Sequence, residues 1–218
     1  MSDESLFREV DEEVRQEQFK KLWARFGNLV IGICLLVVLG VGGFQGWRYW
    51  QQKQAETAGD SFFAAAQLAL DGKNAEALKT YETISHSGFA LLAKLREAAL
   101  LAADGKPAES VKIYDAVAAD TTVQQTIRDL ASIRAAAALA DTASFADIET
   151  RLKPFAAEGN SWRHVAREML AGVQWRLKDY AGADKQVQAM LADPETPPAL
   201  QQRAQMMAQL LQPLVAAQ

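Results

Sequence analysis

The stretch DGKNAEALKTY at residues 71–81 decides the fold, because it recurs as DGKPAESVKIY at residues 104–114. Seven of the eleven positions are identical, and the two copies lie 33 residues apart. A repeat of this length is typical of units that contain two antiparallel helices. The Gly-Lys pair in each copy predicts the turn between them, because glycine readily adopts the left-handed conformation that ends a helix.

Two weaker copies of the turn follow at residues 143–148 and 178–183, at offsets of 38 and 35 residues. A period near 34 residues is the hallmark of tetratricopeptide helix–turn–helix units. The spacing therefore predicts four helix pairs, which exceeds the three repeats that such an array needs for stability.

Apolar residues recur at helical spacing around these turns, and no stretch shows the two-residue alternation of a half-buried strand. The predicted apolar stripes comprise Ala77, Tyr81 and Ile84; Ile148, Leu152 and Phe155; Ala166, Met169, Leu170, Val173 and Leu177; and Val187 with Met190. The fold class that follows is all-α, with an α-solenoid of tetratricopeptide-repeat type.

The last helix is predicted to cap the solenoid. The chain breaks at Asp193-Pro194 and at Pro197-Pro198, and an amphipathic segment then runs from about residue 199 to residue 211. Its apolar positions are Leu200, Ala204, Met207 and Leu211. A solenoid needs such a terminal helix, because each repeat otherwise leaves one hydrophobic face open.

Residues 26–47 carry no formal charge and predict a transmembrane helix. A helix of 22 residues spans roughly 33 Å, which matches a hydrocarbon core of about 30 Å. The run is longer than the apolar region of a typical signal peptide, and no Ala-x-Ala motif follows it closely, so we expect an uncleaved single-pass anchor.

The basic residues around the anchor predict its orientation. Four of them precede it closely and two follow it, namely Arg15, Lys20, Lys21 and Arg25 against Arg48 and Lys53. The positive-inside rule therefore places the N-terminus in the cytoplasm and the large C-terminal part outside it. Phe19, Leu22, Trp23 and Phe26 share one helical face, and Leu6, Val10 and Val14 extend it toward the N-terminus.

The predicted domain organisation has four parts. Residues 1–25 form a cytoplasmic tail with an amphipathic helix, and residues 26–47 form the anchor. Residues 48–58 form a linker helix, and residues 59–218 form the repeat domain outside the cytoplasm.

Composition argues against nucleic-acid binding and against catalysis. The 218 residues include 23 basic and 27 acidic ones, a net charge of −4, whereas nucleic-acid binders usually carry a basic excess. Cys34 is the single cysteine, which excludes an intramolecular disulfide and a cysteine-based zinc site. His86 and His164 are the two histidines. We therefore predict no catalytic, cofactor-binding or metal site.

The carboxylates and histidines have ordinary structural interpretations. Glu76, Glu109 and Asp147 fall near predicted helix starts, where negative charge favours the helix dipole. His86 is expected in an exposed loop, and His164 is expected as a surface or half-buried helix residue rather than a partner contact.

The chain resembles the YfgM family, the ancillary subunits of the bacterial SecYEG translocon. The resemblance lies in GWRYW at residues 46–50, EGNSW at residues 158–162, and Thr196-Pro197 before a helix containing Met206 and Met207. It implies an inner-membrane protein with a periplasmic repeat domain that contacts the translocon and a membrane-anchored periplasmic folding factor of the PpiD type.

Two function classes therefore compete, and an enzyme is a distant third. The first is a translocon-associated interaction subunit that works with periplasmic chaperones. The second is a membrane-anchored scaffold for another envelope process, such as cell division or cofactor assembly. In either class the first helices of the pairs are expected to line a concave face for a partner segment. Polar residues on those helices are Gln67, Lys94, Arg134, Arg167 and Gln174, and the sequence assigns none of them as a binding residue.

Overall fold

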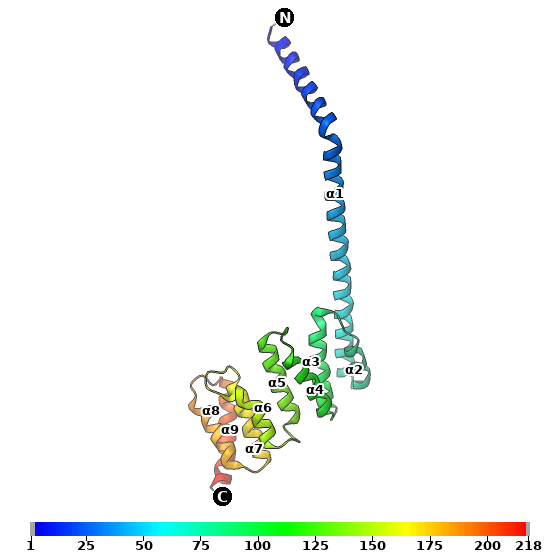
Figure 1. Cartoon of the computed structure of the whole chain (residues 1–218). Coiled ribbons are helices and arrows are strands. Elements are labelled where there is room, and N and C mark those ends of the chain that lie inside the picture. Colours follow the sequence, from blue (N-terminus) through cyan, green and yellow to red (C-terminus); the bar gives the residue numbers. More distant parts are fainter. Residues whose placement is uncertain (1–2, 217–218) are drawn as a thin grey trace. The chain divides into compact units, whose positions relative to one another are not determined.

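The computed structural model describes the backbone of residues 3–216, and the side chains of residue 15 and residues 19–216. Within that range the regular structure is entirely helical (Figure 1). The helices are α1 (Asp3–Leu70), α2 (Asn74–Glu82), α3 (Ser87–Ala103), α4 (Pro107–Ala119), α5 (Gln125–Leu139), α6 (Phe145–Ala156), α7 (Arg163–Arg176), α8 (Tyr180–Ala192) and α9 (Pro198–Val215). The prediction of an all-α fold is confirmed.

The chain divides into two units, residues 1–56 and residues 57–218, which are described separately. In the first unit α1 exposes nearly every described apolar side chain of its uncharged stretch. Among the described residues, α1 is the one helix long and apolar enough to cross a membrane. The predicted stripe of Leu6, Val10 and Val14 lies outside the residues whose side chains are described.

Aromatic and basic side chains meet at both ends of the uncharged stretch. The Arg25 guanidinium lies 5.6 Å from the ring centre of Phe26, and that of Arg48 lies 5.8 Å from the ring centre of Phe44. Arginine and aromatic side chains are enriched at the interface between hydrocarbon and water, so these contacts suit the two ends of a membrane span.

The second unit consists of four helix pairs and a cap, as the repeat spacing predicts. The last turns of α1 pair with α2, and α3–α4, α5–α6 and α7–α8 follow in chain order, with α9 packed on α8 and α7 (Figure 1). The cap helix is longer at its C-terminal end than the predicted 199–211. Each pair thus contributes a first helix and a second helix to the stack.

The core of this unit is a series of four clusters rather than one mass. Each cluster joins both helices of a pair to the first helix of the next pair or, for the last pair, to α9. The predicted stripes are buried or half-buried with one exception. Leu177 is 45% exposed, because it is the cap residue that follows α7 and the chain turns away there.

Three of the four turns within pairs share one geometry. After α1, α3 and α7 the backbone makes the paired hydrogen bonds of a Schellman motif, and the residue after the helix cap is left-handed. Gly72 and Gly105 occupy that position with φ of 76° and 75°, as predicted. In the fourth pair Lys178 takes the same conformation with φ of 62°.

Candidate partner-binding groove

The first helices of three successive pairs enclose an open groove of about 480 Å³ in the repeat unit. We call it the α1–α3–α5 groove. Side chains from these helices and one residue of α4 line it, namely Phe62, Leu92, Leu95, Arg96, Ala99, Tyr114, Leu130 and Arg134. Its size falls in the range of pockets that bind small molecules or several side chains of a partner.

The groove is held in shape by packed aromatic rings. The Phe62 ring lies 5.7 Å from the Tyr81 ring and 6.0 Å from the Phe89 ring, measured between centroids. Tyr114 is buried, and its hydroxyl donates a hydrogen bond of 3.4 Å to the carbonyl oxygen of Leu95. Both tyrosines occur in the repeated DGK segments, so the repeat itself builds the base of the groove.

Apolar side chains remain exposed within and beside the groove. Leu92 on α3 is 47% exposed, and Phe63 on α1, which stacks edge-on against Phe62, is 69% exposed. Leu130 on α5 is half-buried. A partner segment that covered these side chains would remove apolar area from water, which is the main favourable term in protein association.

The two charged residues that line the groove are both arginines. Burial raises the pKa of the Tyr114 hydroxyl, and the positive charges of Arg134 and Arg96 partly oppose that rise. Both guanidinium groups therefore lie close enough to influence the same phenol. Among the described residues that line the groove there is no carboxylate.

The arginines occupy equivalent positions in consecutive repeats. Arg96 and Arg134 are 38 residues apart, as are Leu92 and Leu130, and 38 is the offset between the second and third turns. Each helix thus presents a leucine and, one turn later, an arginine. Sequence reasoning considered Arg134 but missed Arg96, which this offset identifies.

The other residues considered for a concave face lie elsewhere. Gln67 is exposed and donates to Asp71, and Lys94 lines a separate hollow beside the α4–α5 loop. Arg167 is half-buried against the end of α8. Gln174 is buried and donates to Asp179, because it faces the turn of its own pair rather than an open surface. Of these five residues, Arg134 is the one that lines the α1–α3–α5 groove.

Both histidines have structural partners. His86 is half-buried rather than exposed, and it caps α3 by accepting a hydrogen bond of 3.2 Å from the Gly88 N–H. His164 is buried, with its Nε2 atom 2.9 Å from Oδ2 of Asp193. These contacts account for both side chains without a ligand.

His164 belongs to a charged network that joins α7 to the α8–α9 connection. Arg163 donates to both oxygens of Asp193, at 2.7 and 3.2 Å, and at 2.6 Å to Glu195. Hydrogen bonds from Arg163 and His164 hold the pKa of Asp193 well below its usual range. We call these four residues the Arg163–Asp193 network, and they fix the chain that leads into the cap.

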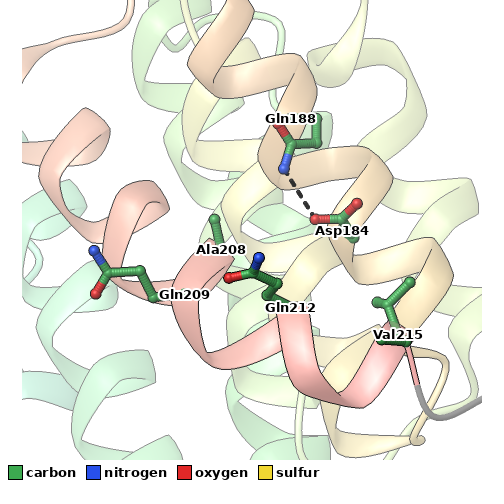
Figure 2. A pocket seen from close by; sticks show the side chains of 7 residues that line it. Asp184, Gln188, Ala208, Gln209, Gln212 and Val215 are labelled. Atoms are coloured by element: carbon green, nitrogen blue, oxygen red, sulfur yellow. Dashed lines mark hydrogen bonds between the residues drawn. The ribbon is translucent and has the colours of Figure 1, made fainter.

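A further hollow lies between α8 and α9, and Figure 2 shows polar side chains of both helices beside Ala208 and Val215 in its lining. Gln188 donates to Asp184 at 3.0 Å on α8, and Gln212 projects toward them from α9. Its exposed amides have no apolar anchor comparable to Leu92. It is the weaker candidate for binding a partner.

The carboxylates near helix starts lie where the sequence places them. Glu76, Glu109 and Asp147 are exposed in the first turns of α2, α4 and α6. Within the described residues, no three His, Cys, Asp or Glu side chains are grouped closely enough to hold a metal ion. Cys34 is a free, exposed thiol in the uncharged stretch of α1.

Comparison with known families matches residues 20–155 to the model of a tetratricopeptide repeat-like domain. That match covers more than half of the chain and includes the whole α1–α3–α5 groove. The chain belongs to the tetratricopeptide repeat-like domain family.

The chain is also similar to a curated protein whose role is described. A Haemophilus influenzae protein described as an ancillary SecYEG translocon subunit is 33% identical over 95 residues. The match covers 41% of this chain and 45% of the relative. The chain therefore spans about half the length of the curated relative that it matches. No solved structure matches the chain.

Proposed function

We propose that this tetratricopeptide repeat-like protein is a non-catalytic interaction subunit of the bacterial inner membrane that associates with the SecYEG translocon. The observation that carries the proposal is a membrane-spanning candidate helix in the same chain as a repeat unit with an open groove. The similarity to a relative described as a translocon subunit supports SecYEG as the proposed membrane complex.

The proposed arrangement follows the charge pattern around the anchor. Residues 1–25 remain in the cytoplasm, residues 26–47 cross the membrane, and residues 48–58 lead to a periplasmic repeat domain at residues 59–218. The basic residues before the anchor outnumber those after it, which supports this orientation. In that compartment the repeat domain meets exported chains and a membrane-anchored folding factor of the PpiD type.

The proposal that the protein is non-catalytic is supported by the structural roles of its histidines and of the acidic residues at helix starts. His164 is engaged by Asp193, and His86 caps a helix. The acidic residues at helix starts are exposed and favour helix dipoles. Binding through the groove accounts for the repeat unit without a reaction.

Affinity purification tests the proposed partner. The tagged full chain is expressed at its natural level, extracted from inner membranes in a mild detergent, and captured beside an unrelated single-pass protein with the same tag. The channel subunits should be enriched with the full chain over the control. Equal, background amounts of channel would refute the translocon role and favour a scaffold for another envelope process.

Cysteine labelling tests the orientation separately. In a Cys34→Ala background, Lys73→Cys on the exposed turn of the first pair should react with a membrane-impermeant thiol reagent once the outer membrane is permeabilised. Ser5→Cys should react only after the inner membrane is opened. The reverse pattern would place the repeat domain in the cytoplasm and exclude the periplasmic role.

A further inference from the structure

The α1–α3–α5 groove is positively charged in an acidic protein. The chain has a net charge of −4, yet the charged residues that line this groove are Arg96 and Arg134. The rest of the lining is apolar or aromatic. A local excess of positive charge on an apolar surface favours ligands that carry both negative charge and apolar groups.

The two groove arginines differ from the other arginines of the repeat unit. Arg151 pairs with Asp115 at 2.7 Å, and Arg203 pairs with Glu168 at 2.5 Å. Among residues 57–216 every other arginine likewise donates a hydrogen bond, whereas Arg96 and Arg134 have neither a hydrogen bond nor an ion pair. Their guanidinium donors are available to a partner.

Guanidinium groups recognise carboxylates through paired, charge-assisted hydrogen bonds. The repeat places one guanidinium on α3 and one on α5, each one turn from a leucine that lines the same groove. A ligand that pairs with both guanidinium groups therefore carries carboxylates in more than one place, with apolar side chains near them. A single small anion would leave the leucines and Phe62 uncovered.

We propose that the α1–α3–α5 groove binds an acidic, amphipathic peptide segment of a partner protein. Its Asp or Glu side chains pair with Arg96 and Arg134, and its apolar side chains cover Phe62, Leu92 and Leu130. This inference rests on the proposed function, because it specifies what an interaction subunit would hold in this groove.

The experiment measures peptide binding to the full chain in detergent micelles by fluorescence anisotropy. The probe is a labelled 15-residue peptide of Leu, Phe, Glu and Ala, and the comparison peptide has every Glu replaced by Gln. The acidic peptide should bind, and the Gln peptide should bind at least tenfold more weakly. Arg96→Gln and Arg134→Gln should each weaken binding of the acidic peptide about tenfold, which is the usual scale for one charge-assisted pair.

Two further variants separate specific pairing from general charge. Arg96→Lys keeps the positive charge and should retain more binding than Arg96→Gln. Lys185→Gln removes an exposed positive charge on α8, outside the groove, and should bind like the wild type. Helicity and the thermal midpoint of each variant are recorded, so that a loss of fold is recognised.

Several outcomes would overturn the inference. Equal binding of the Glu and Gln peptides to the wild-type chain would do so without any variant. Unchanged binding by folded Arg96→Gln and Arg134→Gln, or an equal loss in Lys185→Gln, would also exclude pairing in the groove. If inorganic phosphate at millimolar concentration displaced the peptide completely, the site would be a simple anion site.

The peptide experiment and the translocon experiment fail independently. Channel subunits that co-purify with the wild-type chain while peptides bind without regard to charge would leave the translocon role intact and reject this inference. Specific binding of the acidic peptide without co-purified channel would keep the groove assignment and direct it to another partner.

Discussion

The first two helix pairs and the last pair have the same topology but are stabilised by different chemistry. The first two pairs turn at Gly72 and Gly105 and pack a buried tyrosine at the same repeat position. The last pair turns at Lys178, and the Arg163–Asp193 network holds the chain that follows it. The comparison teaches that helix pairing is retained while the side chains that secure it change, which explains why the later repeats are hard to recognise.

The largest effect is expected from the aromatic packing of the first pair. Tyr81→Ala removes a buried ring that packs edge-on against Phe62, and it should lower the free energy of unfolding by about 3–5 kcal/mol. Chemical denaturation followed by circular dichroism measures the loss. Tyr81→Phe keeps the ring and should match the wild type. If Tyr81→Ala lowered the free energy of unfolding only slightly, aromatic packing would not distinguish the first pair from the last pair.

A smaller effect is expected when the Arg163–Asp193 network is broken. Asp193→Asn replaces the carboxylate that binds the buried His164 and Arg163 with a neutral amide that has one acceptor oxygen, although the exposed Glu195 still binds Arg163. The thermal midpoint at pH 7 should therefore fall clearly, but less than in Tyr81→Ala. Glu195→Gln is the control, because its side chain is 76% exposed, and it should change the midpoint little.

The same variant predicts a dependence on pH. Because the folded pKa of Asp193 is depressed, its contribution is present above the unfolded value of about 3.9 and is lost as the pH falls further. The difference in stability between wild type and Asp193→Asn should thus stay constant above about pH 5 and shrink at more acidic pH. A difference that grew on acidification would contradict the assigned charge state.

The left-handed turn residues give the next effect. Gly105→Ala places a side chain at φ of 75° with open space around it, so its cost is conformational, roughly 1–2 kcal/mol. Lys178→Gly removes the side chain that makes this left-handed conformation unfavourable in the last pair. It should stabilise the folded protein by less than about 1 kcal/mol, because glycine also has more conformational freedom in the unfolded chain. If both substitutions destabilised equally, the two turns would not be equivalent.

The smallest effect concerns one hydroxyl. Tyr114→Phe removes the bond to the Leu95 carbonyl and should cost about 0.5–1.5 kcal/mol, whereas Tyr81→Phe removes only a hydroxyl with no hydrogen-bond partner among the described residues. Urea unfolding of the two variants in parallel measures this difference. Identical values would show that the long bond of Tyr114 contributes nothing.

The sequence alone predicts the helix pairs and turns well, because apolar spacing and glycine act locally. The stripe at Ala77, Tyr81 and Ile84 is buried as predicted. Leu177 breaks its stripe because the helix ends there, which is a matter of register at a boundary. Helical spacing therefore identifies a buried face more reliably than it identifies the last residue of that face.

The groove was harder to predict because it depends on which side chains lack partners. Gln174 and Arg134 look alike as polar residues on first helices, but one meets Asp179 in its own turn and the other remains open. The Arg163–Asp193 network likewise joins residues 30 positions apart, one at the start of α7 and the other directly after α8. Such pairings require the folded geometry, although the repeat offset does relate Arg96 to Arg134.

The four serial core clusters have a consequence for which substitutions the repeat unit tolerates. Helices α3, α5 and α7 each contribute to two neighbouring clusters, whereas α4, α6 and α8 contribute to one. On α5 the buried members of the two clusters are mostly alanines, with Ala131 and Ala135 in one cluster and Ala136 in the other, which lets helices approach on both sides. Larger residues on these first helices are therefore excluded on two faces at once, so variation between relatives should concentrate on the second helices of the pairs.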